Sequence, residues 1–138
     1  MTERGKVLPN HSAGAGRKIL FADDDPIARK IYRHHIERAG YEWVEASNGR
    51  DALEAAEREK LLLAVLDIEM PERDGLSVLL ELKKSPGTSA LPVIMITAFQ
   101  AYYSCRQQLK AAGAACLLTK PFGPAQLLAA FGACLNHT

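Results

Sequence analysis

The sequence has few cysteines, no long hydrophobic stretch and no excess of charge of either sign. Its three cysteines are an odd number, and none forms a CxxC pair or lies at metal-ligand spacing from a histidine. This favours free thiols in a reducing compartment over a disulfide scaffold or a zinc site. No apolar run approaches the ~18 residues that a membrane span needs, and the N-terminus lacks the apolar core of a secretory signal. The net charge of +1 provides no strong attraction for nucleic acid or an anionic membrane. We therefore expect a cytoplasmic protein with no direct nucleic-acid contact and no membrane insertion.

The composition is that of an ordinary globular protein. Apolar residues make up 48% and charged residues 24% of the 138 residues, which suits a single domain with a real core. Residues 1–17 contain Gly, Pro, Asn, His and Ser and show no hydrophobic periodicity, so we interpret them as a flexible N-terminal arm. The folded domain is expected over residues 18–138.

From residue 18 onward, short apolar runs alternate five times with amphipathic stretches. This alternation predicts an α/β protein with a (βα)₅ order, a parallel sheet and helices on both faces. In the first helix, Ala28, Ile31, His35 and Ala39 share one face that we expect to lie inward. The expected strands cover 19–22, 41–46, 61–66, 93–97 and 115–119, and the helices follow them at about 26–39, 48–58, 76–82, 102–112 and 124–135.

Polar side chains end four of the five expected strands: Asp23, Asp24 and Asp25, then Asp67, Thr97 and Lys120. Ligands of doubly wound sheets bind at this carboxyl edge. Several carboxylates in one place repel each other unless a cation intervenes, and an oxygen-only site suits Mg²⁺. A lysine and a threonine beside them provide partners for further anionic oxygens. The pattern therefore indicates an aspartate that becomes an acyl phosphate, with Asp25 acting instead as a helix cap.

Four motifs carry a family resemblance: residues 19–26, residues 66–71 with Asp74-Gly75, residues 96–98, and residues 120–122. In this order and spacing, they resemble the response-regulator receiver domain of two-component phosphotransfer systems. The resemblance covers residues 18–135. It implies a flavodoxin-like, doubly wound fold with five parallel strands in the order 2-1-3-4-5.

The resemblance also implies a role for each site residue. Asp67 would accept a phosphoryl group from a phosphohistidine of a sensor histidine kinase or a histidine phosphotransferase. The cofactor would be Mg²⁺, bound directly by Asp24, Asp67 and the backbone carbonyl of Glu69, and through water by Asp23. Thr97 and Lys120 would bind phosphoryl oxygens, and the Lys120–Pro121 peptide would be cis. Such a domain catalyses only its own phosphorylation and dephosphorylation and turns over no metabolite.

Partners and departures follow from the same resemblance. The helix at 27–39 would dock the kinase, and the fourth helix, fifth strand and fifth helix (102–112, 115–119 and 124–135) would bind a downstream protein. No output domain is expected after the last helix. Leu117 stands where the family usually has an aromatic switch residue. Glu69 and Phe99 occupy positions that modulate how fast the phosphoryl group is lost.

Two other functions compete with this interpretation. A haloacid-dehalogenase-type phosphatase would use Asp23 as its nucleophile, but it would leave Asp67 without a role, and nothing acidic follows Glu81 to supply its metal site. A pseudo-receiver would act as an adaptor without phosphorylation. The complete set of site residues argues against it.

Overall fold

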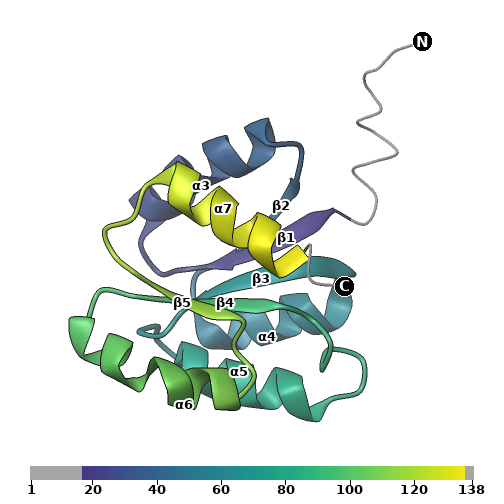
Figure 1. The fold of residues 1–138 in the computed structure, drawn as a ribbon. Helices are drawn as coiled ribbons and strands as arrows, with labels where there is room; N and C mark the ends of the chain where they lie inside the picture. Colours follow the sequence, from purple (N-terminus) through teal and green to yellow (C-terminus); the bar gives the residue numbers. More distant parts are fainter. Residues whose placement is uncertain (1–16, 136–138) are drawn as a thin grey trace.

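The computed structural model describes residues 17–135, which form one sheet with helices on both of its faces (Figure 1). The strands are β1 (Lys18–Ala22), β2 (Glu42–Ala46), β3 (Leu61–Asp67), β4 (Val93–Thr97) and β5 (Cys116–Thr119). The helices are α3 (Pro26–Arg38), α4 (Gly49–Arg58), α5 (Gly75–Lys84), the 3₁₀ helix η1 (Gln100–Cys105), α6 (Arg106–Ala111) and α7 (Pro124–Leu135). The predicted alternation of strand and helix is confirmed.

The sheet is parallel throughout and has the strand order β2-β1-β3-β4-β5, as predicted. Its register aligns the carboxyl ends of the central strands, because Asp67 pairs with Ile96 and Thr97 pairs with Thr119. The polar residues that end these strands are therefore brought to one edge of the sheet.

Successive side chains of the central strands point to opposite faces of the sheet. Ala64 and Leu66 of β3 join the core under α4, α5 and α6, whereas Leu63 and Val65 join the core under α3 and α7. All four side chains are fully buried. This explains why β3 is a continuous apolar run rather than an alternating one.

Three helices begin with a side-chain cap at the carboxyl edge of the sheet. The Asp25 carboxylate accepts a hydrogen bond from the Ile27 amide at 2.9 Å, which confirms its predicted role as the cap of α3. Asn48 accepts from the Asp51 amide, and Asp74 accepts from the Ser77 amide, each at 2.7 Å. Each cap satisfies a backbone donor that the first helical turn leaves unpaired.

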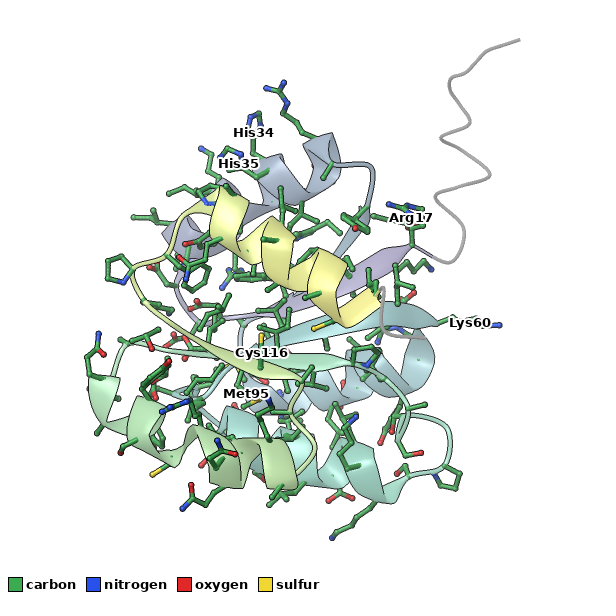
Figure 2. The ribbon with its side chains drawn as sticks, in the orientation of Figure 1. Arg17, His34, His35, Lys60, Met95 and Cys116 are labelled. Carbon is green, nitrogen blue, oxygen red and sulfur yellow. The ribbon has the colours of Figure 1, made fainter. Side chains whose placement is uncertain are left out.

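The predicted inward face of α3 is wrong by about one residue. Ile31 is 48% exposed, and the buried side of the helix is formed by Tyr32 and Ile36. Of the two histidines labelled in Figure 2, His34 is exposed and His35 is half-buried. The face is selected by aromatic packing, because the Tyr32 ring stacks on Phe21 of β1 at 5.4 Å between centroids. The few apolar residues of this helix left two faces possible from the sequence alone.

The predicted fourth helix also differs in its first half. Residues 100–105 form the 3₁₀ helix η1, and only residues 106–111 are α-helical. Leu109 is buried, whereas Cys105 is exposed. The helical periodicity therefore fails where the chain is wound more tightly than an α-helix.

Two further expectations concern the chain ends and the cysteines. The N-terminal arm at 1–17 lies outside the described residues except for Arg17, whose guanidinium lies 4.4 Å from the centre of the Tyr41 ring. The three cysteines are free thiols. Within residues 17–135, no helix combines the length and the apolar character required for a membrane crossing.

We expect Gly75→Ala to destabilise the protein by about 2–3 kcal/mol, as overpacking does in a rigid core. A Cβ at Gly75 would lie 2.3 Å from the backbone oxygen of Asp67, because α5 begins directly against the end of β3. Urea unfolding measures this loss. Gly87→Ala is the matched control, since a Cβ at Gly87 meets nothing within 4 Å. Equal stability of the two variants would show that the contact between α5 and β3 is not tight.

Candidate functional site

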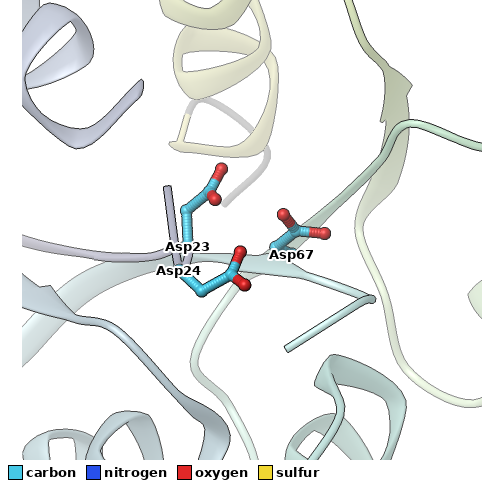
Figure 3. Close-up of side chains that lie close together, drawn as sticks. All are labelled: Asp23, Asp24 and Asp67. Carbon is cyan, nitrogen blue, oxygen red and sulfur yellow. The ribbon is translucent and has the colours of Figure 1, made fainter. Parts of the chain in front are cut away.

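Three aspartates gather at the carboxyl ends of β1 and β3 (Figure 3). One carboxylate oxygen from each of Asp23, Asp24 and Asp67 lies within 4.8 Å of the others. Asp23 is fully buried and Asp67 is 3% exposed, whereas Asp24 faces solvent. Strand geometry explains the cluster, because β1 and β3 are neighbours that end at the same level.

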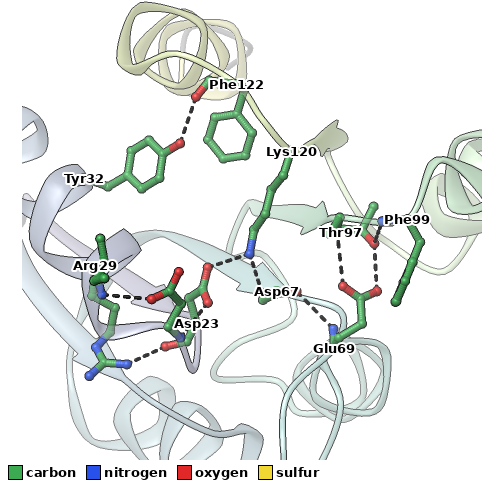
Figure 4. Close-up of polar contacts among 12 residues, drawn as sticks. Asp23, Arg29, Tyr32, Asp67, Glu69, Thr97, Phe99, Lys120 and Phe122 are labelled. Carbon is green, nitrogen blue, oxygen red and sulfur yellow. Dashed lines mark hydrogen bonds and ion pairs between the residues drawn. The ribbon is translucent and has the colours of Figure 1, made fainter.

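Lys120 compensates two of these carboxylates (Figure 4). Its Nζ donates to Oδ2 of Asp23 at 2.9 Å and to Oδ2 of Asp67 at 2.8 Å. Lys120 directly follows β5, and its backbone amide donates to the Thr97 carbonyl at 2.7 Å. The Lys120–Pro121 peptide is cis, as the resemblance implied.

Burial dominates the electrostatics of Asp67. It raises the pKa of this carboxyl group to about 7, and the nearby Asp23 charge acts in the same direction. Lys120 and the Glu69 amide, which donates to Asp67 Oδ1 at 3.0 Å, oppose the rise. Burial also lowers the pKa of Lys120, but its bonds to Asp67 and Asp23 outweigh burial and leave that pKa above its usual value. The site is therefore short of positive charge.

Contacts that the sequence analysis did not find hold the rim of the site. The Arg29 guanidinium donates to the Asp23 carbonyl at 2.7 Å, and the Tyr32 hydroxyl donates to the Phe122 carbonyl at 2.8 Å (Figure 4). Each contact joins α3 to a segment that carries a site residue. Neither follows a sequence pattern, because each depends on which face of α3 packs on the sheet.

Thr97 lies at the end of β4 and is fully buried. Its hydroxyl donates to Oε2 of Glu69 at 2.7 Å and accepts from the Phe99 amide at 3.0 Å. The Ala98 amide approaches Oε1 of Glu69 at 3.4 Å. Thr97 and Lys120 thus lie at adjacent strand ends, but Thr97 bonds Glu69 and Lys120 bonds the aspartates. The sequence analysis had not identified the bond between Glu69 and Thr97.

The donor set fits a hard divalent cation. Asp23, Asp24 and Asp67 offer only carboxylate oxygens, and within residues 17–135 no histidine or cysteine belongs to this cluster. Mg²⁺ prefers such oxygen ligands and keeps several waters. Asp23 and Asp67 are buried and share a single lysine, and the exposed Asp24 lies beside them, so a cation would relieve the repulsion among the three carboxylates. The residues present therefore fit the predicted metal.

Comparison with known proteins gives the family. The model of the response regulator receiver domain matches residues 19–132. The chain belongs to the response regulator receiver domain family. The Bacillus subtilis alkaline phosphatase synthesis transcriptional regulatory protein PhoP is 34% identical over 122 residues, which are 88% of this chain and 50% of that protein. This receiver domain thus spans about half the length of the curated relatives it matches.

Solved receiver structures agree with the fold. Vibrio cholerae chemotaxis response regulator CheY4 superposes with a TM-score of 0.79 at 30% identity, covering 86% of this chain and 98% of that one. The receiver domain of a Pseudomonas aeruginosa sensor histidine kinase, solved with magnesium in its active site cleft, gives a TM-score of 0.78 at 27% identity. That match covers 88% of this chain and 98% of the other. Receiver domains are signalling domains that generally bind Mg²⁺ and interact with phosphotransfer proteins and downstream targets.

Leu117, where the resemblance implies an aromatic residue, is a strand residue in this fold. It lies in the middle of β5, opposite Met95 of β4, and packs half-buried against the core under α4, α5 and α6. An aliphatic residue in this place contributes packing but has no aromatic ring.

Proposed function

We propose that Asp67 is the residue of this receiver domain that accepts a phosphoryl group from a phosphohistidine on a histidine kinase or phosphotransferase. The observation that carries the proposal is the environment of Asp67. It is the buried carboxylate that ends the central strand, and it shares Lys120 with a second buried carboxylate. A carboxylate in this position combines a nucleophile with groups that bind the oxygens of its product.

In the transfer, an Asp67 oxygen forms a bond to phosphorus while the bond from phosphorus to the histidine nitrogen breaks. The imidazole leaves with the electron pair of that bond and takes up a proton. Lys120 Nζ, 2.8 Å from Asp67 Oδ2, is placed to bind an oxygen of the transferred group. Asp23, Asp24, Asp67 and the Glu69 carbonyl would hold Mg²⁺, which neutralises phosphoryl charge when it is bound. The Glu69 amide orients Asp67 through its hydrogen bond to Oδ1.

The surfaces around the site suit protein partners. Ile27 and Ile31 of α3 are 68% and 48% exposed, although both are large and apolar. This exposed stripe supports α3 as the kinase-docking element. The downstream partner would bind over α6, β5 and α7. Lys120, which directly follows β5, joins this surface to the site. We place the domain in the cytoplasm.

The phosphatase alternative has less support. Asp23 would be its nucleophile, and this would leave Asp67, the buried carboxylate at the end of β3, without a role. No acidic residue follows Glu81 to supply the metal site of such a phosphatase. The adaptor alternative would leave a buried, undercompensated carboxylate cluster without a use.

The test is phosphorylation by acetyl phosphate and by a phosphohistidine phosphotransferase, followed by peptide mapping. We expect one added phosphoryl group, about 80 Da, on the peptide that contains Asp67 and only when Mg²⁺ is present. Phosphate on the peptide that contains Asp23 would favour the phosphatase. No phosphate from either donor would favour the adaptor.

A further inference from the structure

The Glu69 carboxylate lies across the end of β4, where it binds the polar groups of Thr97 and Ala98 (Figure 4). The 2.7 Å bond from the Thr97 hydroxyl is short, as expected when the acceptor carries a charge. Glu69 is two residues after Asp67, and its own amide bonds Asp67. One residue therefore touches the phosphorylation site with its backbone and the end of β4 with its side chain.

The Thr97 hydroxyl has one proton to donate. Glu69 accepts the hydrogen bond that this proton makes, and the Phe99 amide donates to the same Thr97 oxygen. Thr97 is fully buried, so solvent does not provide a substitute partner. An anionic group on Asp67 can gain this hydroxyl only when Glu69 gives it up.

Resting on the proposed function, we propose that the Glu69 carboxylate competes with the Asp67 phosphoryl group for the Thr97 hydroxyl. Release of Thr97 by Glu69 is then a required step of activation. We call the Thr97–Glu69 contact the Glu69 latch. Glu69 is a positioning residue here, because it acts on the phosphoryl group through Thr97.

Charge favours an exchange rather than a shared hydrogen bond. A phosphoryl group brings a charge of about −1.5 to −2 close to the Glu69 carboxylate. The two anions repel each other, and Glu69 is partly exposed, so its side chain has solvent to turn into. Phosphorylation would therefore draw the hydrogen bond of the Thr97 hydroxyl away from Glu69 and repel the Glu69 carboxylate.

The experiment measures binding of beryllofluoride, a stable phosphoryl mimic, by calorimetry in excess Mg²⁺. We expect Glu69→Ala to bind about tenfold more tightly than the wild type, since loss of one charge-assisted hydrogen bond has an effect of this order. Glu69→Gln should gain less, because its amide oxygen still accepts from Thr97. The affinity for Mg²⁺ is measured separately. Removing the negative charge of Glu69 should weaken Mg²⁺ binding. A change in Mg²⁺ affinity would therefore oppose the expected gain in beryllofluoride affinity and could not mimic it.

A double-mutant cycle with Thr97→Val isolates the latch from other effects of Glu69. In the Thr97→Val background, Glu69→Ala should change beryllofluoride affinity less than twofold. Thr97→Ser keeps the hydroxyl, so it should restore the gain and exclude a mere packing defect. Glu72→Gln is the charge control. It removes one negative charge from an exposed glutamate that pairs with Arg50, and it should leave the affinity for beryllofluoride unchanged.

Each outcome decides a different claim. A gain in Glu69→Ala that disappears with Thr97→Val supports the latch. No gain, or a gain that persists in Thr97→Val, overturns it while leaving Asp67 phosphorylation intact. Failure of the wild type itself to bind beryllofluoride or to accept phosphate would overturn the proposed function, and the latch with it.

Discussion

Asp67→Asn should gain no phosphoryl group from any donor and yet unfold at a higher temperature than the wild type. The first result follows because an amide nitrogen or oxygen cannot replace the carboxylate nucleophile. The second follows because folding buries the Asp67 charge at a cost. We expect a stabilisation of about 2 kcal/mol at pH 8 without metal, roughly 6 °C in Tm.

The sign of the stability effect is set by the pKa of Asp67. Its value of about 7 in the folded protein exceeds the ordinary value of 3.8. Between these two values the folded state binds more protons than the unfolded state, so wild-type stability falls as pH rises from about 4 to about 7. The advantage of Asp67→Asn should therefore be largest above pH 7 and absent below about pH 4. Loss of the bond to Lys120 limits the gain.

Thermal unfolding at pH 4, 6 and 8, in EDTA and in Mg²⁺, checks this expectation. Added Mg²⁺ should stabilise the wild type and reduce the advantage of Asp67→Asn. Asp24→Asn is the control, because Asp24 belongs to the same cluster but is exposed. It should lose stabilisation by Mg²⁺ without a comparable gain in EDTA. A less stable Asp67→Asn at pH 8 would mean that Lys120 more than compensates the buried charge.

The sequence predicted the fold and the polar strand ends that meet at one edge of the sheet, because both depend on local patterns. Five apolar runs alternating with helices require a parallel sheet, and such a sheet brings its carboxyl ends together. Asp23, Asp67, Thr97 and Lys120 each end a strand, so their shared location needed no knowledge of side-chain packing. The aspartate cluster and the contact of Lys120 with it follow from the same topology.

What the sequence did not predict depends on side-chain choices. The buried face of α3 is decided by the stacking of Tyr32 on Phe21, which hydrophobic periodicity does not encode. The Glu69–Thr97 bond joins residues 28 positions apart on adjacent strand ends. Several polar groups compete for partners there, and only their geometry determines which pairs form. The resemblance implied a role for each site residue, but it did not imply that Glu69 and Thr97 are hydrogen-bonded to each other.

Lys120→Met should destabilise the metal-free protein by about 3 kcal/mol at pH 8, roughly 10 °C in Tm, and Mg²⁺ should restore most of this loss. The substitution keeps much of the side-chain volume but removes the cation from Asp23 and Asp67. Both carboxylates stay buried, and each is 2.9 Å or less from the lysine nitrogen in the wild type. Two buried charges would then repel each other without compensation.

The pH dependence separates this electrostatic effect from lost packing. Without Lys120 the pKa of Asp67 must rise further, so the defect should shrink as pH falls from 8 to 5 and Asp67 takes up a proton. Lys60→Met, which removes an exposed lysine, should change Tm little under any condition. A loss in Lys120→Met that is independent of both pH and Mg²⁺ would contradict the charge argument, because packing lost with the lysine stem responds to neither. A loss reversed by either one identifies Lys120 as the cation that holds the unphosphorylated site together until Mg²⁺ binds.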